Sequence, residues 1–95
     1  MSDLVLRMPL NLLQDKELSI SAKMVYTYML WKYKHSVKQH GYYSESQAQI
    51  AAVCDMSRKT VNESIQALEG KKWVTQTKFE RQNSFYEVYD VFCLY

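Results

Sequence analysis

Residues 43–74, with the sequence YSESQAQIAAVCDMSRKTVNESIQALEGKKWV, decide the fold of this chain. The first helix start is SESQ at residues 44–47, a Ser-x-x-Gln capping-box pattern that predicts a helix over residues 45–53. The second start is Ser57, which predicts a helix over residues 58–69 that ends at Gly70. The residues between them, VCDM at 53–56, leave room only for a tight turn. Two short helices joined in this way predict a helix-turn-helix, a motif whose second helix usually enters the major groove of DNA.

The second predicted helix separates an apolar face from a polar one. Val61, Ile65 and Leu68 follow the i, i+4, i+7 spacing of a core-facing stripe. The opposite face therefore carries side chains suited to hydrogen bonding with base edges and phosphates, namely Arg58, Lys59, Asn62, Glu63 and Gln66.

A β-hairpin is expected after this helix. Residues 73–79 and 85–91 alternate between apolar and polar side chains, which is typical of strands, and a polar tip separates them at residues 80–84. A hairpin in this position is a wing, whose tip can reach a neighbouring groove or the DNA backbone. The wing side chains expected to contact DNA are Lys78, Arg81 and Asn83.

The remaining segments complete one domain over residues 1–95. An apolar segment at residues 4–8 predicts a short N-terminal strand, and Pro9 opens a short helix over residues 9–13. Ser19 is the expected N-cap of a long helix over residues 20–38, and residues 42–43 can form a very short strand. The fold class is therefore α+β: a winged helix-turn-helix with a three-helix core, a C-terminal β-hairpin wing and a short N-terminal strand.

Composition fits a small DNA-binding domain and disfavours an enzyme. The 95 residues carry a formal net charge of +2, and residues 58–81 hold three acidic residues against the basic residues Arg58, Lys59, Lys71, Lys72, Lys78 and Arg81. This excess suits phosphate binding, although an ordinary solvated surface would look the same. No His, Cys and carboxylate set has metal-ligand spacing, and no Gly-rich loop is present, so we expect no enzyme activity, no metal, no cofactor and no small-molecule ligand.

The cysteines and the hydropathy pattern predict the cellular compartment of the protein. Cys54 and Cys93 are too few for a disulfide framework, and reduced thiols suit a cytoplasm. The N-terminus lacks the pattern of a signal peptide, and no apolar run approaches a membrane span. We therefore expect a cytoplasmic protein that is not bound to a membrane.

The sequence resembles the winged helix-turn-helix domains at the N-termini of plasmid and phage replication initiation proteins. Leu13, LSISAK at residues 18–23, YSESQAQIA at residues 43–51 and MSRKTV at residues 56–61 carry the resemblance. It implies that Ser44, Ser46 and Gln47 approach phosphates. It also implies a groove-facing surface made of Ser57, Arg58, Lys59, Thr60, Asn62, Glu63 and Gln66.

Two departures from that family pattern bear on the structure and the biology. Asp55 stands where many such turns place Gly, but Asp tolerates the left-handed backbone conformation that the turn requires. An initiator normally continues into a second domain, whereas this chain stops soon after the wing. Both an initiator fragment and a small stand-alone regulator therefore remain open.

The long helix also predicts a homodimer. It is apolar over most of its circumference, and residues 4–6 and 91–95 add further apolar surface near the chain ends. A two-fold interface built from these segments would place two reading helices about 34–36 Å apart on the DNA. In the alternative, both terminal segments pack on the helix within one chain.

The function expected from the sequence is sequence-specific binding of double-stranded DNA. The protein would be a transcription regulator or a replication initiator of a plasmid, a phage or another mobile element, in a bacterial cytoplasm. The alternative is a winged-helix module for protein contacts without DNA binding. The polar outer face of the helix over residues 58–69 favours DNA binding, because the same face is often apolar in a winged helix that binds proteins.

Overall fold

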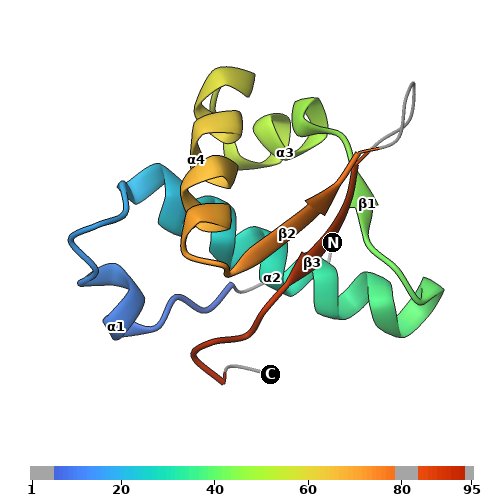
Figure 1. Cartoon of the computed structure of the whole chain (residues 1–95), viewed down its shortest axis with the longest axis horizontal. Coiled ribbons are helices and arrows are strands. Elements are labelled where there is room, and N and C mark those ends of the chain that lie inside the picture. The colour runs from blue at the N-terminus through green and yellow to red at the C-terminus, as the bar shows by residue number, and fades with distance from the viewer. Residues whose placement is uncertain (1–5, 79–83, 94–95) are drawn as a thin grey trace.

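Four helices and a three-stranded sheet make up the structure, a computed structural model that describes residues 6–78 and 84–93. The elements follow one another along the chain as shown in Figure 1: α1 (Leu10–Leu13), α2 (Ile20–His40), β1 (Ser44–Glu45), α3 (Gln47–Cys54), α4 (Arg58–Gly70), β2 (Val74–Thr77) and β3 (Ser84–Val88). This is the predicted order of a helix-turn-helix followed by a wing.

Helix α2 begins where predicted and ends two residues later than predicted. The Ser19 hydroxyl oxygen accepts a hydrogen bond from the backbone N–H of Ala22 at 3.1 Å, which caps the N-terminus. At the other end, Gly41 adopts a φ of 83° and its N–H bonds to the carbonyl of Val37. The left-handed conformation available to glycine therefore ends the helix after His40.

The capping box of α3 lies two residues beyond the predicted one. The Ser46 hydroxyl accepts from the N–H of Gln49 at 3.1 Å, and the Gln49 side chain accepts from the N–H of Ser46 at 3.3 Å. Both SESQ at residues 44–47 and SQAQ at residues 46–49 fit the pattern. Pairing of Ser44 and Glu45 with β3 decides between them, because a residue in a strand cannot also open the helix.

The sheet is antiparallel with the strand order β1-β3-β2. Ser44 pairs with Phe85 on one side of β3, and Val74 pairs with Val88 on the other. The short strand after α2 therefore occupies residues 44–45, not 42–43, and β2 and β3 are shorter than predicted. Within the described residues, the predicted N-terminal strand is wrong for residues 6–8, which form no strand, while residues 4 and 5 lie outside the description.

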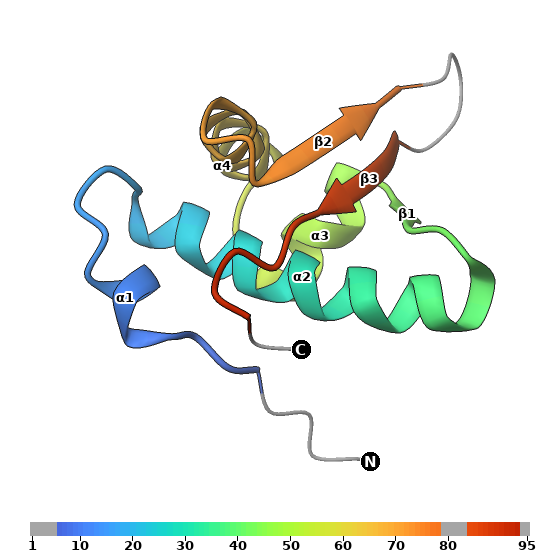
Figure 2. The ribbon, with the colours of Figure 1, turned by 60° about the horizontal axis from the view of Figure 1, so that its bottom comes forward.

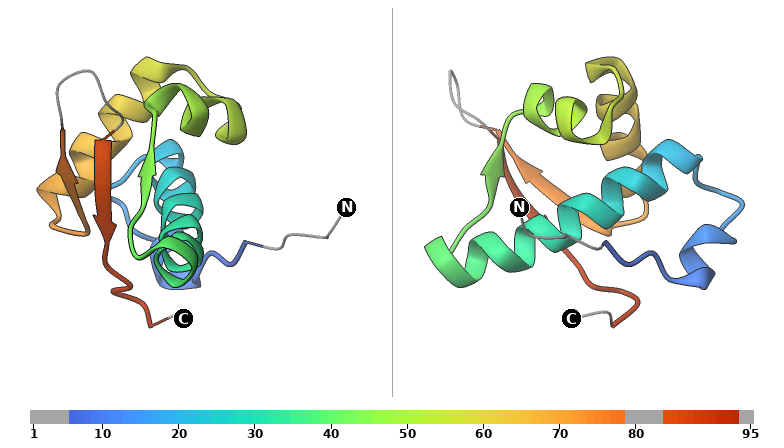
Figure 3. Two further views of the ribbon diagram at one scale, coloured as in Figure 1. Left: turned by 90° about the vertical axis from the view of Figure 1, so that its right-hand side faces the viewer. Right: turned by 180° about the vertical axis from the view of Figure 1, so that it is seen from behind.

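Helix α2 crosses the whole molecule, with α4 and the sheet on one side of it (Figure 2 and Figure 3). Fully buried side chains from α2, α3 and α4 meet there, among them Tyr26, Met29, Ile50, Ile65 and Leu68. Tyr86 and Val88 of β3 close this core from the sheet. The core fixes α3 and α4 on one frame, which is what a rigid reading surface requires.

The segment after β3 packs on α2 within the same chain. The Tyr26 hydroxyl donates to the carbonyl of Tyr89 and accepts from the N–H of Val91, and burial raises the pKa of Tyr26 to about 12. The Phe92 ring lies 5.4 Å from the Trp73 ring and 6.2 Å from the Tyr26 ring. Phe92 therefore covers part of α2 within one chain, as expected if the C-terminal segment packs on the long helix instead of forming a dimer interface. Residues 94 and 95 lie outside the described residues.

No helix in the described part of the chain has both the length and the apolar character needed to cross a membrane.

Candidate nucleic-acid interface

A tight turn through Asp55 sets the angle between α3 and α4. Asp55 adopts a left-handed conformation with a φ of 56°, and the N–H of Met56 bonds to the carbonyl of Ala51 at 3.0 Å. Asp in place of the more usual Gly is therefore accommodated, as predicted. The buried, small Ala51 lets the two helices approach closely.

Serine 57 caps α4, as predicted. Its hydroxyl oxygen accepts from the N–H of Thr60 at 3.1 Å and lies 2.9 Å from the Thr60 hydroxyl. Ser57 is exposed and Thr60 is half-buried. The N–H groups of this first turn carry the positive end of the helix dipole, an arrangement that attracts phosphate.

The two faces of α4 separate as predicted from the spacing. Val61, Ile65 and Leu68 are 0% exposed. The side chains of the outer face are exposed except for the half-buried Asn62; the exposed ones are Arg58, Lys59, Glu63 and Gln66. The apolar side of α4 is thus buried in the core, and most of its polar side is exposed and accessible to an external partner.

The side chain of Gln47, at the start of α3, contacts the outer face of α4. Its Nε2 donates a hydrogen bond to Oδ1 of Asn62 at 3.2 Å. Gln47 also lies beside the buried hydroxyl of Tyr86 on β3; burial raises the pKa of Tyr86, and the neighbouring Ser84 and Gln47 side chains partly offset this. One half-buried glutamine therefore links α3 to α4.

Ser44 and Ser46, the other two residues that the resemblance implies to approach phosphates, each have a role in local secondary structure. Ser44 lies in β1 opposite Phe85, and Ser46 uses its hydroxyl as the N-cap of α3. Both side chains are half-buried. The Ser46 hydroxyl already accepts from Gln49, so its own O–H and a second lone pair of its oxygen remain for further hydrogen bonds.

A buried carboxylate that the sequence analysis missed holds β1 in place. Glu45 is 7% exposed, and its carboxylate accepts hydrogen bonds from the hydroxyls of Tyr28 and Tyr43. Burial, followed by the hydrogen bond to Glu45 and then by its charge, raises the pKa of both tyrosines. These bonds lock β1 to α2, which in turn fixes the start of α3. No local pattern reveals that Glu45 turns inward, because the decision comes from the pairing of β1 with β3.

The structure describes one of the three wing residues that were predicted to contact DNA. Lys78 is exposed just after β2, whereas Arg81 and Asn83 lie outside the described residues. Figure 1 places the N-terminal end of α4, the helix α3 and the ends of β2 and β3 nearest the wing along one edge of the molecule. These elements carry most of the candidate DNA-binding residues that the structure describes.

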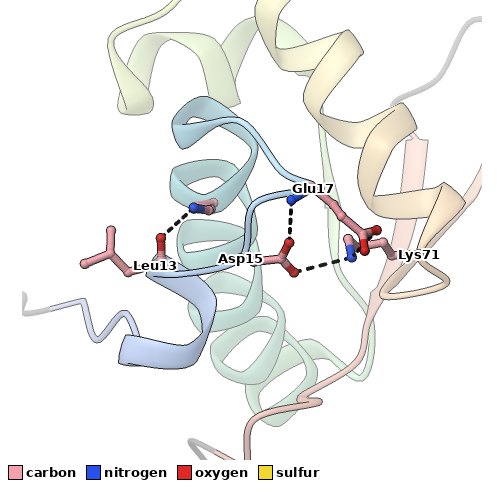
Figure 4. A network of polar contacts seen from close by, with 5 residues as sticks. Leu13, Asp15, Glu17 and Lys71 are labelled. Carbon is pink, nitrogen blue, oxygen red and sulfur yellow. Dashed lines mark hydrogen bonds and ion pairs between the residues drawn. The ribbon is translucent and has the colours of Figure 1, made fainter.

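Lys71 and Lys72 lie at the other end of α4 and do not belong to this edge, which corrects the basic excess counted along residues 58–81. Lys71 Nζ forms ion pairs with Asp15 at 3.3 Å and Glu17 at 3.2 Å (Figure 4). The N–H of Glu17 donates to Asp15 at 2.8 Å, and this bond, together with Lys71, lowers the pKa of Asp15. Lys71 thus joins α4 to the loop before α2 and has a structural role.

A second lysine is also used inside the fold. Lys23 on α2 is 7% exposed, and its Nζ donates to the carbonyl of Leu13 at 2.6 Å, which fastens α1 to α2.

Within residues 6–78 and 84–93, no group of three or more His, Cys, Asp or Glu side chains is placed to hold a metal ion.

Comparison with known proteins gives structural relatives only. No protein-family model matches the chain, and no curated protein matches it. A solved structure described as "Structure of Rep-DNA complex" superposes with a TM-score of 0.72 at 11% identity, covering 90% of this chain and 75% of that one. A second, described as "N-Terminal domain of DNA binding protein", superposes with a TM-score of 0.72 at 11% identity, covering 90% of this chain and 74% of that one. These likenesses confirm the predicted α+β fold, a winged helix-turn-helix.

Proposed function

We propose that this chain is a sequence-specific binder of double-stranded DNA that reads the major groove with α4. The wing contacts the backbone or a neighbouring minor groove. The protein serves as a transcription regulator or replication initiator of a plasmid, phage or other mobile element, in a bacterial cytoplasm and without catalytic activity. The proposed DNA-binding residues are Ser44, Ser46, Gln47, Ser57, Arg58, Lys59, Thr60, Asn62, Glu63, Gln66, Lys78, Arg81 and Asn83.

The observation that carries the proposal is the composition of the outer face of α4. Arg58 and Lys59 are exposed on its first turn, next to a helix N-terminus that attracts phosphate. Asn62 and Gln66 follow one and two turns later with amide groups of the kind that pair with adenine. A winged helix that served only protein contacts would be expected to present apolar side chains here. The structural neighbour solved with DNA supports the same partner.

Glu63 has a separate place in the proposal. It is an exposed carboxylate on the face that would meet negatively charged DNA. A carboxylate in a reading helix can accept from the amino group of cytosine, and it disfavours bases that present only acceptors. Glu63 therefore adds discrimination, not affinity.

We further propose that the domain acts as a homodimer through the apolar surface around the N-terminal half of α2. Leu6, Met24 and Val53 are 42%, 43% and 60% exposed, and they line one pocket of about 290 Å³. Leu10, Leu13 and Ile20 are exposed nearby in sequence on α1 and at the start of α2. Apolar side chains exposed in such number favour an interface.

Selection from a random duplex library with the purified protein tests the proposal. Enrichment of one sequence is expected, and an inverted repeat would indicate the dimer, whereas direct repeats would favour an initiator. If no sequence is enriched over the starting library, the protein-contact alternative replaces DNA reading.

A further inference from the structure

We propose that a groove between the C-terminal half of α2 and the outer face of the wing sheet binds an arginine side chain presented by a protein partner. The groove has a volume of about 360 Å³. Tyr33 and Val37 line it from α2, Tyr42 from the turn after α2, Thr75 from β2, and Phe85 and Glu87 from β3. We call it the aromatic groove.

Tyr33, Tyr42 and Phe85 are among the aromatic side chains that line the aromatic groove. The Tyr42 ring is 54% exposed and lies 5.5 Å from the Phe85 ring, tilted by 52°. Tyr33 and Phe85 are half-buried, so part of each ring borders the groove while the rest packs against the protein. The negative faces of such rings attract a cation that is placed above them.

The charge of the aromatic groove also favours a cation. Glu87 is an exposed carboxylate that accepts a hydrogen bond from the Tyr89 hydroxyl at 3.1 Å. Its charge reaches across to α2, because it adds to the effect of burial in raising the pKa of Tyr33. No lysine, arginine or histidine is among the described residues that line the groove. Among the described lining residues a phosphate group would meet a carboxylate and no cationic side chain, so we do not assign the groove to the DNA surface.

Arginine fits these walls better than lysine does. A guanidinium group is planar, stacks on aromatic rings and pairs with a carboxylate through two parallel N–H bonds. A lysine ammonium is a strongly hydrated point charge that can use neither the plane nor the fork. A protein is the expected source, because the groove is open enough to admit a side chain and the Thr75 and Thr77 hydroxyls on its rim suit a peptide backbone.

The aromatic groove shares no residue with the proposed DNA-binding set. Its residues lie on α2, the following turn, and the β2 and β3 faces, whereas the reading face lies on α4 and the start of α3. A partner held in the groove therefore leaves α4 free, and the inference stands or falls independently of DNA reading.

Backbone amide NMR spectra recorded during titration with N-acetyl-arginine amide test the inference. We expect shifts concentrated at Tyr33, Tyr42, Phe85 and Glu87, and at least about threefold weaker binding of N-acetyl-citrulline amide, which keeps the shape and lacks the charge. Equal binding of the two compounds, or shifts spread over the whole surface, would overturn the proposal.

Matched carboxylate variants locate the site. Glu87→Gln should weaken binding of N-acetyl-arginine amide by about threefold to fivefold, whereas Glu63→Gln, which removes an exposed carboxylate from α4, should leave it unchanged. Thermal unfolding of both variants confirms that each is folded. Equal effects of the two substitutions would mean non-specific ion pairing and would refute the site.

A capped Gly-Gly-Arg-Gly-Gly peptide separates a protein partner from a small cation. The peptide should bind more tightly than N-acetyl-arginine amide, with added shifts at Thr75 and Thr77. Binding of the peptide no tighter than that of the amide would overturn the assignment to a protein.

Discussion

The Nε2 of Gln47 donates to Oδ1 of Asn62 across the helix-turn-helix, at 3.2 Å. The bond fixes one side of the Asn62 amide and leaves its NH₂ group and the second lone pair of Oδ1 available. An asparagine that pairs with adenine uses those two groups together. If Asn62 reads a base as proposed, Gln47 is its positioning residue.

Replacing Gln47 should weaken specific DNA binding more than it weakens binding to random duplex. In Gln47→Ala the Asn62 amide loses its orienting bond, and we expect a loss of about 1 kcal/mol on the selected sequence. Gln39→Ala, an exposed glutamine at the end of α2, is the matched control and should behave like the unsubstituted protein. Fluorescence anisotropy with both duplexes measures the effect. Strictly additive losses in the double variant with Asn62→Ala would contradict the coupling.

Lys78 should contribute one phosphate contact through the wing. Removing its charge in Lys78→Gln should reduce the magnitude of the negative slope of log K against log salt concentration by about 0.9. Lys71→Gln removes an equal charge from the far end of α4, where the amine pairs with Asp15 and Glu17, and should leave the slope unchanged. An unaltered slope in Lys78→Gln would show that this part of the wing does not touch DNA.

The Lys71 ion pairs should be visible in the titration of Asp15. In the folded protein its pKa lies below 3.8, first because it accepts from the N–H of Glu17 and then because of Lys71. A lowered pKa contributes stability above the unfolded value, and this contribution is lost as the pH falls through the folded value. In Lys71→Gln the pKa of Asp15 should rise but stay below 3.8, because the Glu17 bond remains. Carbon-detected NMR titration measures it, with the exposed Lys72→Gln as control; an unshifted pKa in Lys71→Gln would contradict the pairing.

The proposed dimer should depend on the apolar surface near the start of α2. Met24→Glu places a charge among exposed apolar side chains, so light scattering at micromolar concentration should give a mass near one chain. Lys34→Glu, a substitution at an exposed position farther along α2, should leave the dimer intact. A mass near one chain for the unsubstituted protein, with or without DNA, would rule the dimer out.

The sequence was sufficient to predict the two helices of the helix-turn-helix, α3 and α4, because the signals that define them are local. The Ser57 cap, the i, i+4, i+7 stripe ending at Leu68 and the left-handed Asp55 each follow from a few neighbouring residues. The start of α3 was misplaced by two residues because two overlapping Ser-x-x-Gln patterns compete, and pairing with a strand about 40 residues away decides between them.

Features that depend on distant partners escaped prediction for the same reason. The buried Glu45 carboxylate, the ion pairs of Lys71 and the packing of Phe92 on Trp73 each join residues that only the fold brings together. For the candidate site, the polar outer face of α4 could be predicted from its sequence alone, whereas the Gln47–Asn62 contact between α3 and α4 became apparent only from the structure.

The most direct test of the central claim is the affinity of Arg58→Ala for the selected duplex and for a scrambled duplex at one salt concentration. Arg58 is exposed on the first turn of α4, the part of a recognition helix that contacts base edges in helix-turn-helix proteins. We predict a loss of about 1–3 kcal/mol on the selected duplex and a much smaller one on the scrambled duplex. Equal losses on both duplexes would reduce Arg58 to a phosphate contact, and unchanged affinity for both would contradict the claim that α4 reads DNA.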